Sequence, residues 1–68
     1  MEIEQIEVEL DGWDRKILAV LLENGRITVT DLAHRIGLSK TPCQMRMRRL
    51  IDSGVILGFR AVVDPAKV

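Results

Sequence analysis

The chain has little of the residue types that define several large classes of protein. It holds one cysteine, Cys43, and one histidine, His34, among 68 residues, so it can form no internal disulfide. A single chain therefore cannot assemble a tetrahedral zinc site, and we expect Cys43 in the core and His34 on a helix surface. No nucleophile–base pair and no Gly-rich phosphate loop is visible, so we expect no enzyme activity and no cofactor.

Long apolar runs are also missing. The sequence contains no stretch that resembles a secretory signal or a membrane span, although 47% of its residues are hydrophobic. A lone cysteine suits a reducing compartment. We therefore expect a cytoplasmic protein that does not bind a membrane.

A net charge is absent as well, because ten acidic residues balance ten basic ones. The two signs are nevertheless separated. Residues 1–14 carry six acids and no Lys or Arg, so residues 15–68 hold all ten basic residues and the other four acids. Between Leu38 and Ile51 there are four basic side chains and no acid. An acidic start followed by a basic body is one pointer to nucleic-acid binding.

Apolar residues at helical spacing predict three helices and a mainly α fold. The first helix begins after Asp11, a good N-cap, and ends at Asn24-Gly25, where glycine supplies a left-handed residue. We expect Trp13 to anchor this helix in the core. Its apolar face comprises Leu10, Trp13, Ile17, Val20 and Leu21.

The second and third helices are closely connected. The second begins after Thr28, which forms a pattern like a capping box with Asp31, and ends at Gly37. The third spans residues 40–53, with Pro42 in its first turn, where a missing N–H costs nothing. Their apolar faces are expected to lie inward: Val29, Leu32, Ala33 and Ile36 on the second helix, and Cys43, Met47, Leu50 and Ile51 on the third.

Two short helices joined by a tight turn containing Gly37 match the helix-turn-helix motif, whose second helix lies in the DNA major groove. Ala33 fits the place where the motif needs a small residue. The sequence thus predicts a three-helix, winged-helix-like domain over residues 11–54, in which helix 40–53 reads the bases.

The expected DNA-binding residues form two groups. Residues of helix 40–53 are expected at base edges, where Gln suits adenine, Arg suits guanine and Met can touch a thymine methyl: Lys40, Thr41, Gln44, Met45 and Arg48. Phosphate contacts position the protein on DNA but do not select a base sequence. They are expected from Thr30, Arg35, Ser39 and Arg49. For Arg46 we expect either a DNA contact or a structural ion pair with Asp31 or Glu23.

We predict different structures for the two ends of the chain. Residues 55–63 alternate as a β-strand does, and Pro65 stops the pattern, so residues 55–68 are predicted to be a C-terminal strand and linker. Both faces of this strand are apolar, which indicates pairing with a second subunit; a wing against DNA is the alternative. Residues 1–10 are expected to be an acidic arm, with a strand that pairs with the partner or a DNA-mimicking arm as alternatives.

From Leu10 to about Pro65 the sequence resembles the N-terminal DNA-binding domain of the Lrp/AsnC (feast/famine) family of transcription regulators. The resemblance rests on motifs at unbroken spacing: Leu10-Asp11, Asp14-Arg15, Gly25-Arg26-Ile27, Leu32-Ala33, Gly37-Leu38-Ser39, Thr41-Pro42-Cys43, Arg46, Arg49-Leu50 and Gly54-Val55-Ile56. Helix 40–53 departs from the family pattern at three positions. Lys40 stands in place of a common Pro, Gln44 of a common Leu and Met45 of a usually polar residue.

The resemblance implies a prokaryotic, nucleoid-associated regulator that binds double-stranded promoter DNA as a homodimer or higher homo-oligomer. It also implies that an amino-acid effector acts only through a C-terminal βαββαβ domain, which these residues do not include. We therefore predict a sequence-selective DNA-binding transcription regulator. The alternative is a winged-helix-like protein-interaction adaptor that docks an acidic partner, and whose binding would survive about 0.5 M salt.

Overall fold

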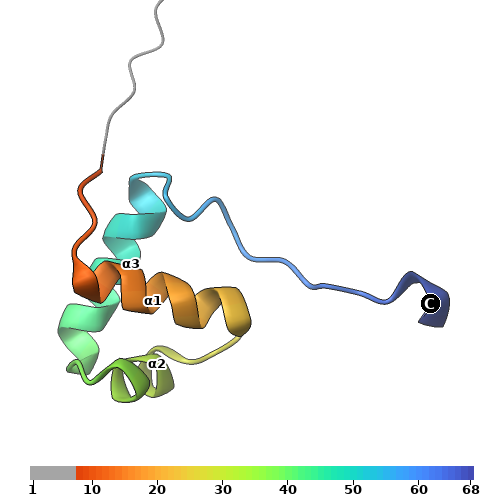
Figure 1. The fold of residues 1–68 in the computed structure, drawn as a ribbon, viewed down its shortest axis with the longest axis horizontal. Helices are drawn as coiled ribbons and strands as arrows, with labels where there is room; N and C mark the ends of the chain where they lie inside the picture. Colours follow the sequence, from red (N-terminus) through yellow and green to blue (C-terminus); the bar gives the residue numbers. More distant parts are fainter. Residues whose placement is uncertain (1–7) are drawn as a thin grey trace, which may run out of the picture.

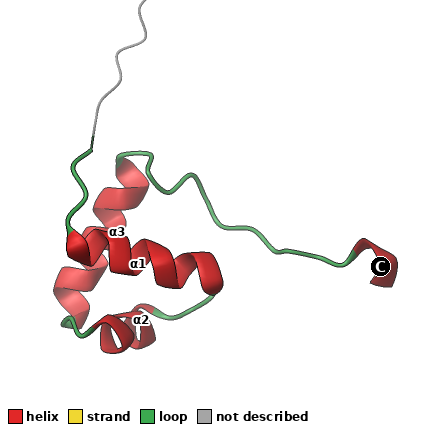
Figure 2. Ribbon diagram, in the orientation of Figure 1, coloured by secondary structure: helices red, strands yellow, loops and turns green. Residues whose placement is uncertain are grey.

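Three helices form the body of the protein, and an extended segment leads away from it (Figures 1 and 2). The computed structural model describes residues 8–68. Its helices are α1 (Gly12–Glu23), α2 (Val29–Ile36) and α3 (Lys40–Asp52), followed by the short 3-10 helix η1 (Pro65–Lys67). No helix among the described residues is long and apolar enough to cross a membrane. The mainly α, three-helix prediction is confirmed, whereas most of the expected acidic arm, residues 1–7, lies outside the described residues.

Reciprocal hydrogen bonds between Asp11 and Asp14 fix the start of α1. The Asp11 carboxylate accepts the N–H of Asp14 at 2.9 Å, and the Asp14 carboxylate accepts the N–H of Asp11 at 3.1 Å. These two bonds are a capping box. The sequence predicted such a box at Thr28 instead, where only half of it forms: the Thr28 hydroxyl accepts the N–H of Asp31 at 3.1 Å. The aspartate side chain at Asp31 is shorter than the glutamate that normally makes the return bond.

Gly37 makes the tight turn between α2 and α3. Its backbone is left-handed, with φ 80° and ψ 32°, a conformation that glycine adopts without steric cost. The carbonyl of Ala33 accepts the N–H of Gly37 at 3.0 Å and that of Leu38 at 2.9 Å, which satisfies the end of α2. Two residues later Ser39 is the N-cap of α3. The expected helix–turn–helix connection is thereby present.

One core joins the three helices. Each contributes two fully or almost fully buried side chains: Ile17 and Val20 from α1, Leu32 and Ala33 from α2, and Cys43 and Leu50 from α3. Cys43 is a packing residue, as expected, with an exposed fraction of 0%.

Two expected core residues neither belong to this core nor pack against it, as the partly buried Leu10, Leu21, Val29, Ile36 and Met47 do. Ile51 is 45% exposed, because it lies about 100° round the helix from Leu50, past the edge that α1 and α2 cover. Trp13 is only half-buried, and the Lys16 ammonium lies 4.8 Å from its ring centroid. Both core assignments were therefore wrong. Leu50, not Ile51, fills the centre of this face.

The predicted C-terminal strand is not formed among the described residues. After Gly54, Val55 and Ile56 still pack against the core, and the N–H of Ile56 donates to the carbonyl of Leu50 at 3.0 Å. Beyond them the chain is extended and exposed; Leu57 is 97% and Val62 100% exposed. A strand needs hydrogen bonds from a neighbouring strand, and residues 8–68 of one chain supply none. The alternating pattern is real, but it does not make a strand without a partner.

Candidate nucleic-acid interface

Helix α3 divides into an outward polar side and an inward apolar side. Cys43 and Leu50 are fully buried beneath it. All five expected base-edge residues lie on the outward side and are exposed, at positions that follow the helical period: Lys40, Thr41, Gln44, Met45 and Arg48. Within residues 8–68, the Arg48 guanidinium makes no ion pair and no hydrogen bond. This side of α3 is therefore open to a partner.

The residues expected to bind phosphate lie around this side, but they differ in whether their side chains are already paired. Thr30, near the start of α2, is exposed. Ser39 caps α3 with its backbone, and its hydroxyl makes no capping bond, so it can donate to another group. Arg35 is paired with Glu23 at 2.8 Å, but both side chains are more than half exposed. An exposed pair of this kind stabilises little and can exchange for another anion.

Arg46 and Arg49 join α3 to the start of α1. Arg46 donates from one guanidinium nitrogen to both Asp11 and Asp14, the second at 3.3 Å. Arg49 donates to Asp14 at 3.3 Å and, through its other nitrogen, to the backbone carbonyl of Glu9 at 2.8 Å. Half of the Arg49 side chain remains exposed. We call these four charged side chains, two arginines and two aspartates, the Asp–Arg cluster.

Of the two expectations for Arg46, the structure bears out the ion pair but not its partners. The expected partners were Asp31 or Glu23, whereas the carboxylates that bind Arg46 are those of Asp11 and Asp14. Glu23 is at the other end of α1, a 12-residue helix about 18 Å long, where it pairs with Arg35. Helical periodicity places a residue on a face but does not say which end of a neighbouring helix that face meets.

The buried carboxylate of Asp14 is the feature that sequence reasoning missed. Its side chain is 0% exposed, although charged residues are almost never fully buried unless they are paired. A signal was available: Asp14 lies three residues from both Asp11 and Ile17, so the helical period places it between the cap and the core.

The hydrogen bond between Asp11 and Arg46 favours the charged form of both side chains. The side-chain hydrogen bond from Arg46 lowers the pKa of Asp11 below its ordinary value of 3.8. The same bond to Asp11 raises the pKa of Arg46. Burial, by contrast, raises the pKa of the Cys43 thiol, which favours the neutral form and fits a packing role.

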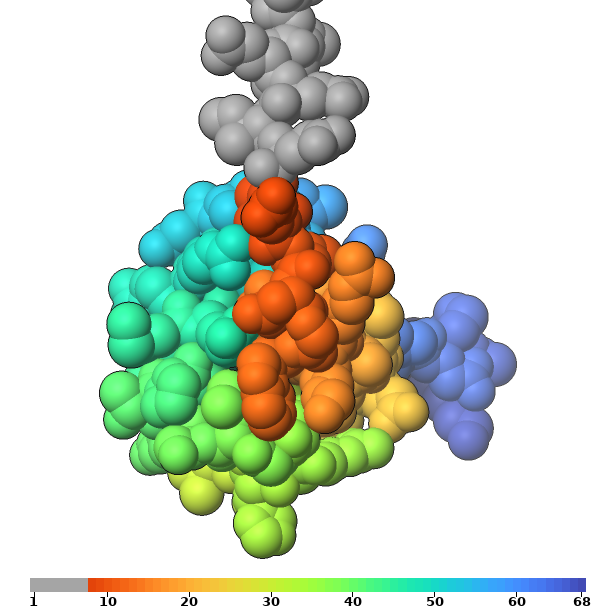
Figure 3. All heavy atoms as spheres, turned by 60° about the vertical axis from the view of Figure 1, so that its left-hand side comes forward, coloured from red at the N-terminus to blue at the C-terminus, as the bar shows by residue number. Residues whose placement is uncertain are grey.

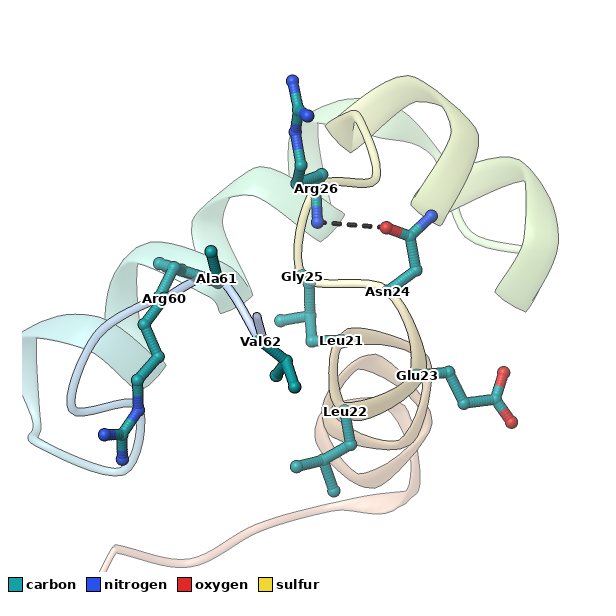
Figure 4. A pocket seen from close by; sticks show the side chains of 10 residues that line it. Leu21, Leu22, Glu23, Asn24, Gly25, Arg26, Arg60, Ala61 and Val62 are labelled. Atoms are coloured by element: carbon teal, nitrogen blue, oxygen red, sulfur yellow. Dashed lines mark hydrogen bonds between the residues drawn. The ribbon is translucent and has the colours of Figure 1, made fainter. Parts of the chain in front are cut away.

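The C-terminal segment leaves the outward side of α3 open. Figure 3 shows α3, in green to teal, beside the start of α1, while the blue segment projects on the other side of the molecule. Where this segment passes the end of α1, it forms a hollow with the α1–α2 loop (Figure 4). Leu21, Leu22 and Val62 supply apolar walls, and the Asn24 side chain accepts the N–H of Arg26 at 3.1 Å. This hollow contains none of the expected DNA-binding residues.

Among the described residues, no group of three or more His, Cys, Asp or Glu side chains could hold a metal ion. The chemistry available at α3 is instead that of hydrogen-bond donors, one amide and positive charge. These groups suit base edges and phosphates.

Comparison with known proteins identifies the family. The family described as "Winged helix-turn-helix DNA-binding" matches residues 10–56. A proline dehydrogenase transcriptional activator of Rhizobium radiobacter is 58% identical over 60 residues, which are 88% of this chain and 38% of that protein. A leucine-responsive regulatory protein of Escherichia coli K12 is 47% identical over 57 residues, 84% of this chain and 35% of the relative. The chain thus spans little more than a third of the length of these relatives.

Solved structures agree with the sequence relatives. The crystal structure of an AsnC family transcriptional regulator from Agrobacterium tumefaciens superposes with a TM-score of 0.82 at 45% identity, covering 85% of this chain and 38% of that one. A transcriptional regulator of Neisseria meningitidis, solved as a complex with L-Met, gives a TM-score of 0.84 at 42% identity, covering 87% and 38%. The chain therefore belongs to the winged helix-turn-helix DNA-binding family, and over most of its length it is similar to part of transcription regulators of the Lrp/AsnC type.

Proposed function

We propose that this chain is the DNA-reading part of a transcription regulator, and that α3 lies in the major groove. The observation that carries the proposal is the division of α3, with exposed polar residues over the buried Cys43 and Leu50. A B-DNA major groove about 12 Å wide admits one helix in this orientation. Family membership supports the same partner, double-stranded DNA.

The side chains of α3 have distinct proposed roles. Gln44 suits the N6 and N7 edge of adenine, Arg48 the O6 and N7 edge of guanine, and Met45, 69% exposed, a thymine methyl. Lys40 and Thr41, at the N-terminal end of α3, complete the set that reaches the bases.

Phosphate contacts are proposed for the residues around that set. Thr30 and Ser39 are exposed residues with hydroxyl side chains at the N-terminal ends of α2 and α3. Arg35 can exchange the exposed Glu23 for a phosphate, while Arg49 keeps half of its side chain in solvent. Such contacts fix register on the duplex and make affinity depend on salt.

We further propose that the protein acts as a homodimer or higher homo-oligomer in the cytoplasm, associated with the nucleoid. Residues 11–54 would read DNA, and residues 55–68 would link this domain to the rest of the regulator. The exposed apolar side chains of Leu57, Phe59 and Val62 support pairing of this segment with a second subunit. An amino-acid effector would act through a further domain; that the Neisseria relative was solved as a complex with L-Met supports an amino acid as the effector.

Salt dependence tests the proposal against its rival, the protein-interaction adaptor. If each subunit neutralises about three or four phosphates, log K for a dimer falls with log salt at a slope of about −5 to −7. A duplex selected from a random pool, titrated by fluorescence anisotropy against random competitor, gives both the slope and the sequence preference. Binding without sequence preference that survives about 0.5 M salt would favour the adaptor.

Arg48→Ala tests the orientation of α3. We expect the Kd for the selected duplex to rise by about 5- to 150-fold, the value of one good base contact, with relaxed preference at one base pair. Arg60→Ala is the matched control, because it removes the same charge from an exposed residue of the C-terminal segment. Equal losses on selected and random duplexes would show that Arg48 contacts phosphate, not a base.

A further inference from the structure

The Asp–Arg cluster places two arginines of the proposed reading helix on one buried carboxylate. Asp14 is 0% exposed, and its two oxygens accept three hydrogen bonds: from the backbone N–H of Asp11, from Arg46 and from Arg49. Because a buried carboxylate is costly unless its charge and lone pairs are satisfied, this arrangement is specific. Removing either Asp14 or its arginine partners leaves uncompensated charge.

The two arginines differ in what they leave free. Arg46 is largely occupied: its side chain is 27% exposed and bonds to both Asp11 and Asp14. Arg49 is 49% exposed, and it uses one N–H of each terminal nitrogen, for Asp14 and for the carbonyl of Glu9. A guanidinium has five N–H donors in a rigid plane, so three remain for another acceptor. The donors already used hold the plane in place.

We propose that Asp14 is a positioning residue for DNA binding, whose buried carboxylate, with the carbonyl of Glu9, presents the Arg49 guanidinium to a DNA phosphate. The inference rests on the proposed function, since it needs Arg49 at the DNA. Arg46 keeps the carboxylate neutralised when Arg49 also bonds to phosphate. An arginine side chain loses much rotamer freedom when it is fixed, and here that loss occurs before DNA arrives. Arg49 is thereby preorganised for its contact.

Arg35 provides an internal comparison. It also makes one ion pair, but its partner Glu23 is 67% exposed and the pair lies in solvent. Exposed pairs exchange readily and hold geometry weakly. Asp14 is therefore expected to control the contribution of its arginine to DNA binding, and Glu23 is not.

A double-mutant cycle between Asp14 and Arg49 tests the proposal. The Kd for the selected duplex is measured for the 68-residue chain, Asp14→Asn, Arg49→Ala and the double variant. We expect Arg49→Ala to raise the Kd about tenfold, as loss of a charged hydrogen bond does, and to make the salt slope shallower by about 1. Asp14→Asn should raise the Kd by a similar factor when Arg49 is present, and by less than twofold when it is absent. Glu23→Gln is the matched control, with an expected change below twofold.

A purely structural role for Asp14 predicts a different pattern, in which Asp14→Asn weakens binding equally in both backgrounds. That result would overturn the proposal, as would unchanged or tighter binding of Asp14→Asn, which would mean that Asp14 competes with phosphate for Arg49. If the chain shows no salt-dependent, sequence-preferring binding at all, the proposed function itself fails.

Arg49→Lys keeps the test decisive if Asp14→Asn does not fold. Lysine retains the charge but, as a single ammonium on a flexible stem, cannot hold Asp14 and the Glu9 carbonyl in the same plane. We expect this variant to keep the helical circular dichroism spectrum and to lose most of the tenfold contribution of Arg49. Binding equal to that of the parent chain would show that charge alone suffices and would overturn the positioning role.

Discussion

The turn at Gly37 offers a test of the fold in which one physical effect is isolated. Its φ of 80° lies in the left-handed region, and a Cβ built on it would meet no atom within 4 Å. Substitution therefore adds no steric clash with the rest of the protein. What remains is the backbone cost of holding an L-residue in a left-handed conformation between α2 and α3.

That cost can be set against the stability of the whole domain. A left-handed L-residue costs about 1–2 kcal/mol, less for Asn, and a β-branched side chain belongs at or above the upper end. A chain of this length is expected to unfold with a free energy of about 3–10 kcal/mol. With about 4–8 °C per kcal/mol for a domain of this size, Gly37→Ala should lower Tm by about 4–16 °C. The expected order of Tm is Gly, Asn, Ala and then Val.

Thermal unfolding followed by far-UV circular dichroism checks the order. Gly12→Ala is the matched control, because Gly12 opens α1 without a left-handed φ and has equal space around its Cβ position. Alanine has the higher helix propensity, so this variant should melt at or slightly above the parent Tm. A Gly37→Ala chain that melts like the parent, or a Gly37→Val chain more stable than Gly37→Ala, would contradict the assignment of the turn.

Two further predictions concern the core and the cap. Leu50→Ala should lower the free energy of unfolding by about 2–5 kcal/mol, enough to unfold much of the chain, whereas Ile51→Ala should cost far less because Ile51 is 45% exposed; equal urea midpoints for the two would contradict this. Because the folded pKa of Asp11 is lowered, its contribution is present above its ordinary value of 3.8 and is lost as pH falls through the lower folded value. The urea midpoints of the parent and Asp11→Asn should therefore differ at pH 5–7 and converge below pH 3.8, and a constant difference down to pH 2 would refute the role of the Asp11 charge.

Local chemistry explains why the helices were predictable. Asp11 and Thr28 begin helices because their side chains accept a backbone N–H of the first turn. Ser39 begins α3 as an N-cap with an extended backbone. Gly37 ends α2 because only glycine takes its φ freely. These choices depend on residues three or four apart, so no knowledge of distant packing is needed.

The wrong predictions concern features that depend on contacts between distant parts of the chain. The strand expected at residues 55–63 needs a neighbouring strand, and its side-chain alternation carries no information on whether one is present. Trp13 and Ile51 were assigned to the core by helical phase, although how far each neighbour covers a face depends on helix crossing. The ion-pair partners of Arg46 were predicted wrongly for the same reason.

The candidate interface was partly readable in advance. The phase of α3 places Met45 and Arg48 on its outward side and Gln44 at the border of the core face, and the structure leaves all three exposed. Their contact with DNA stays a prediction. Spacing along the chain could place Asp14 between the cap and the core, but it could not show that Arg35 and Arg49 are already paired or that two arginines meet the Asp14 carboxylate.

By itself the sequence determined where the helices begin and end, how α2 turns into α3, and which side of α3 is polar, because each depends on neighbours within one or two helical turns. Only the tertiary structure decided which charges meet. The start of α1 lies against the middle of α3. Arg46 and Arg49 therefore both bind the carboxylate of Asp14, which precedes them in the sequence by 32 and 35 positions. Such pairings follow from how the helices pack around Ile17, Leu32 and Leu50, and packing is a property of the whole core.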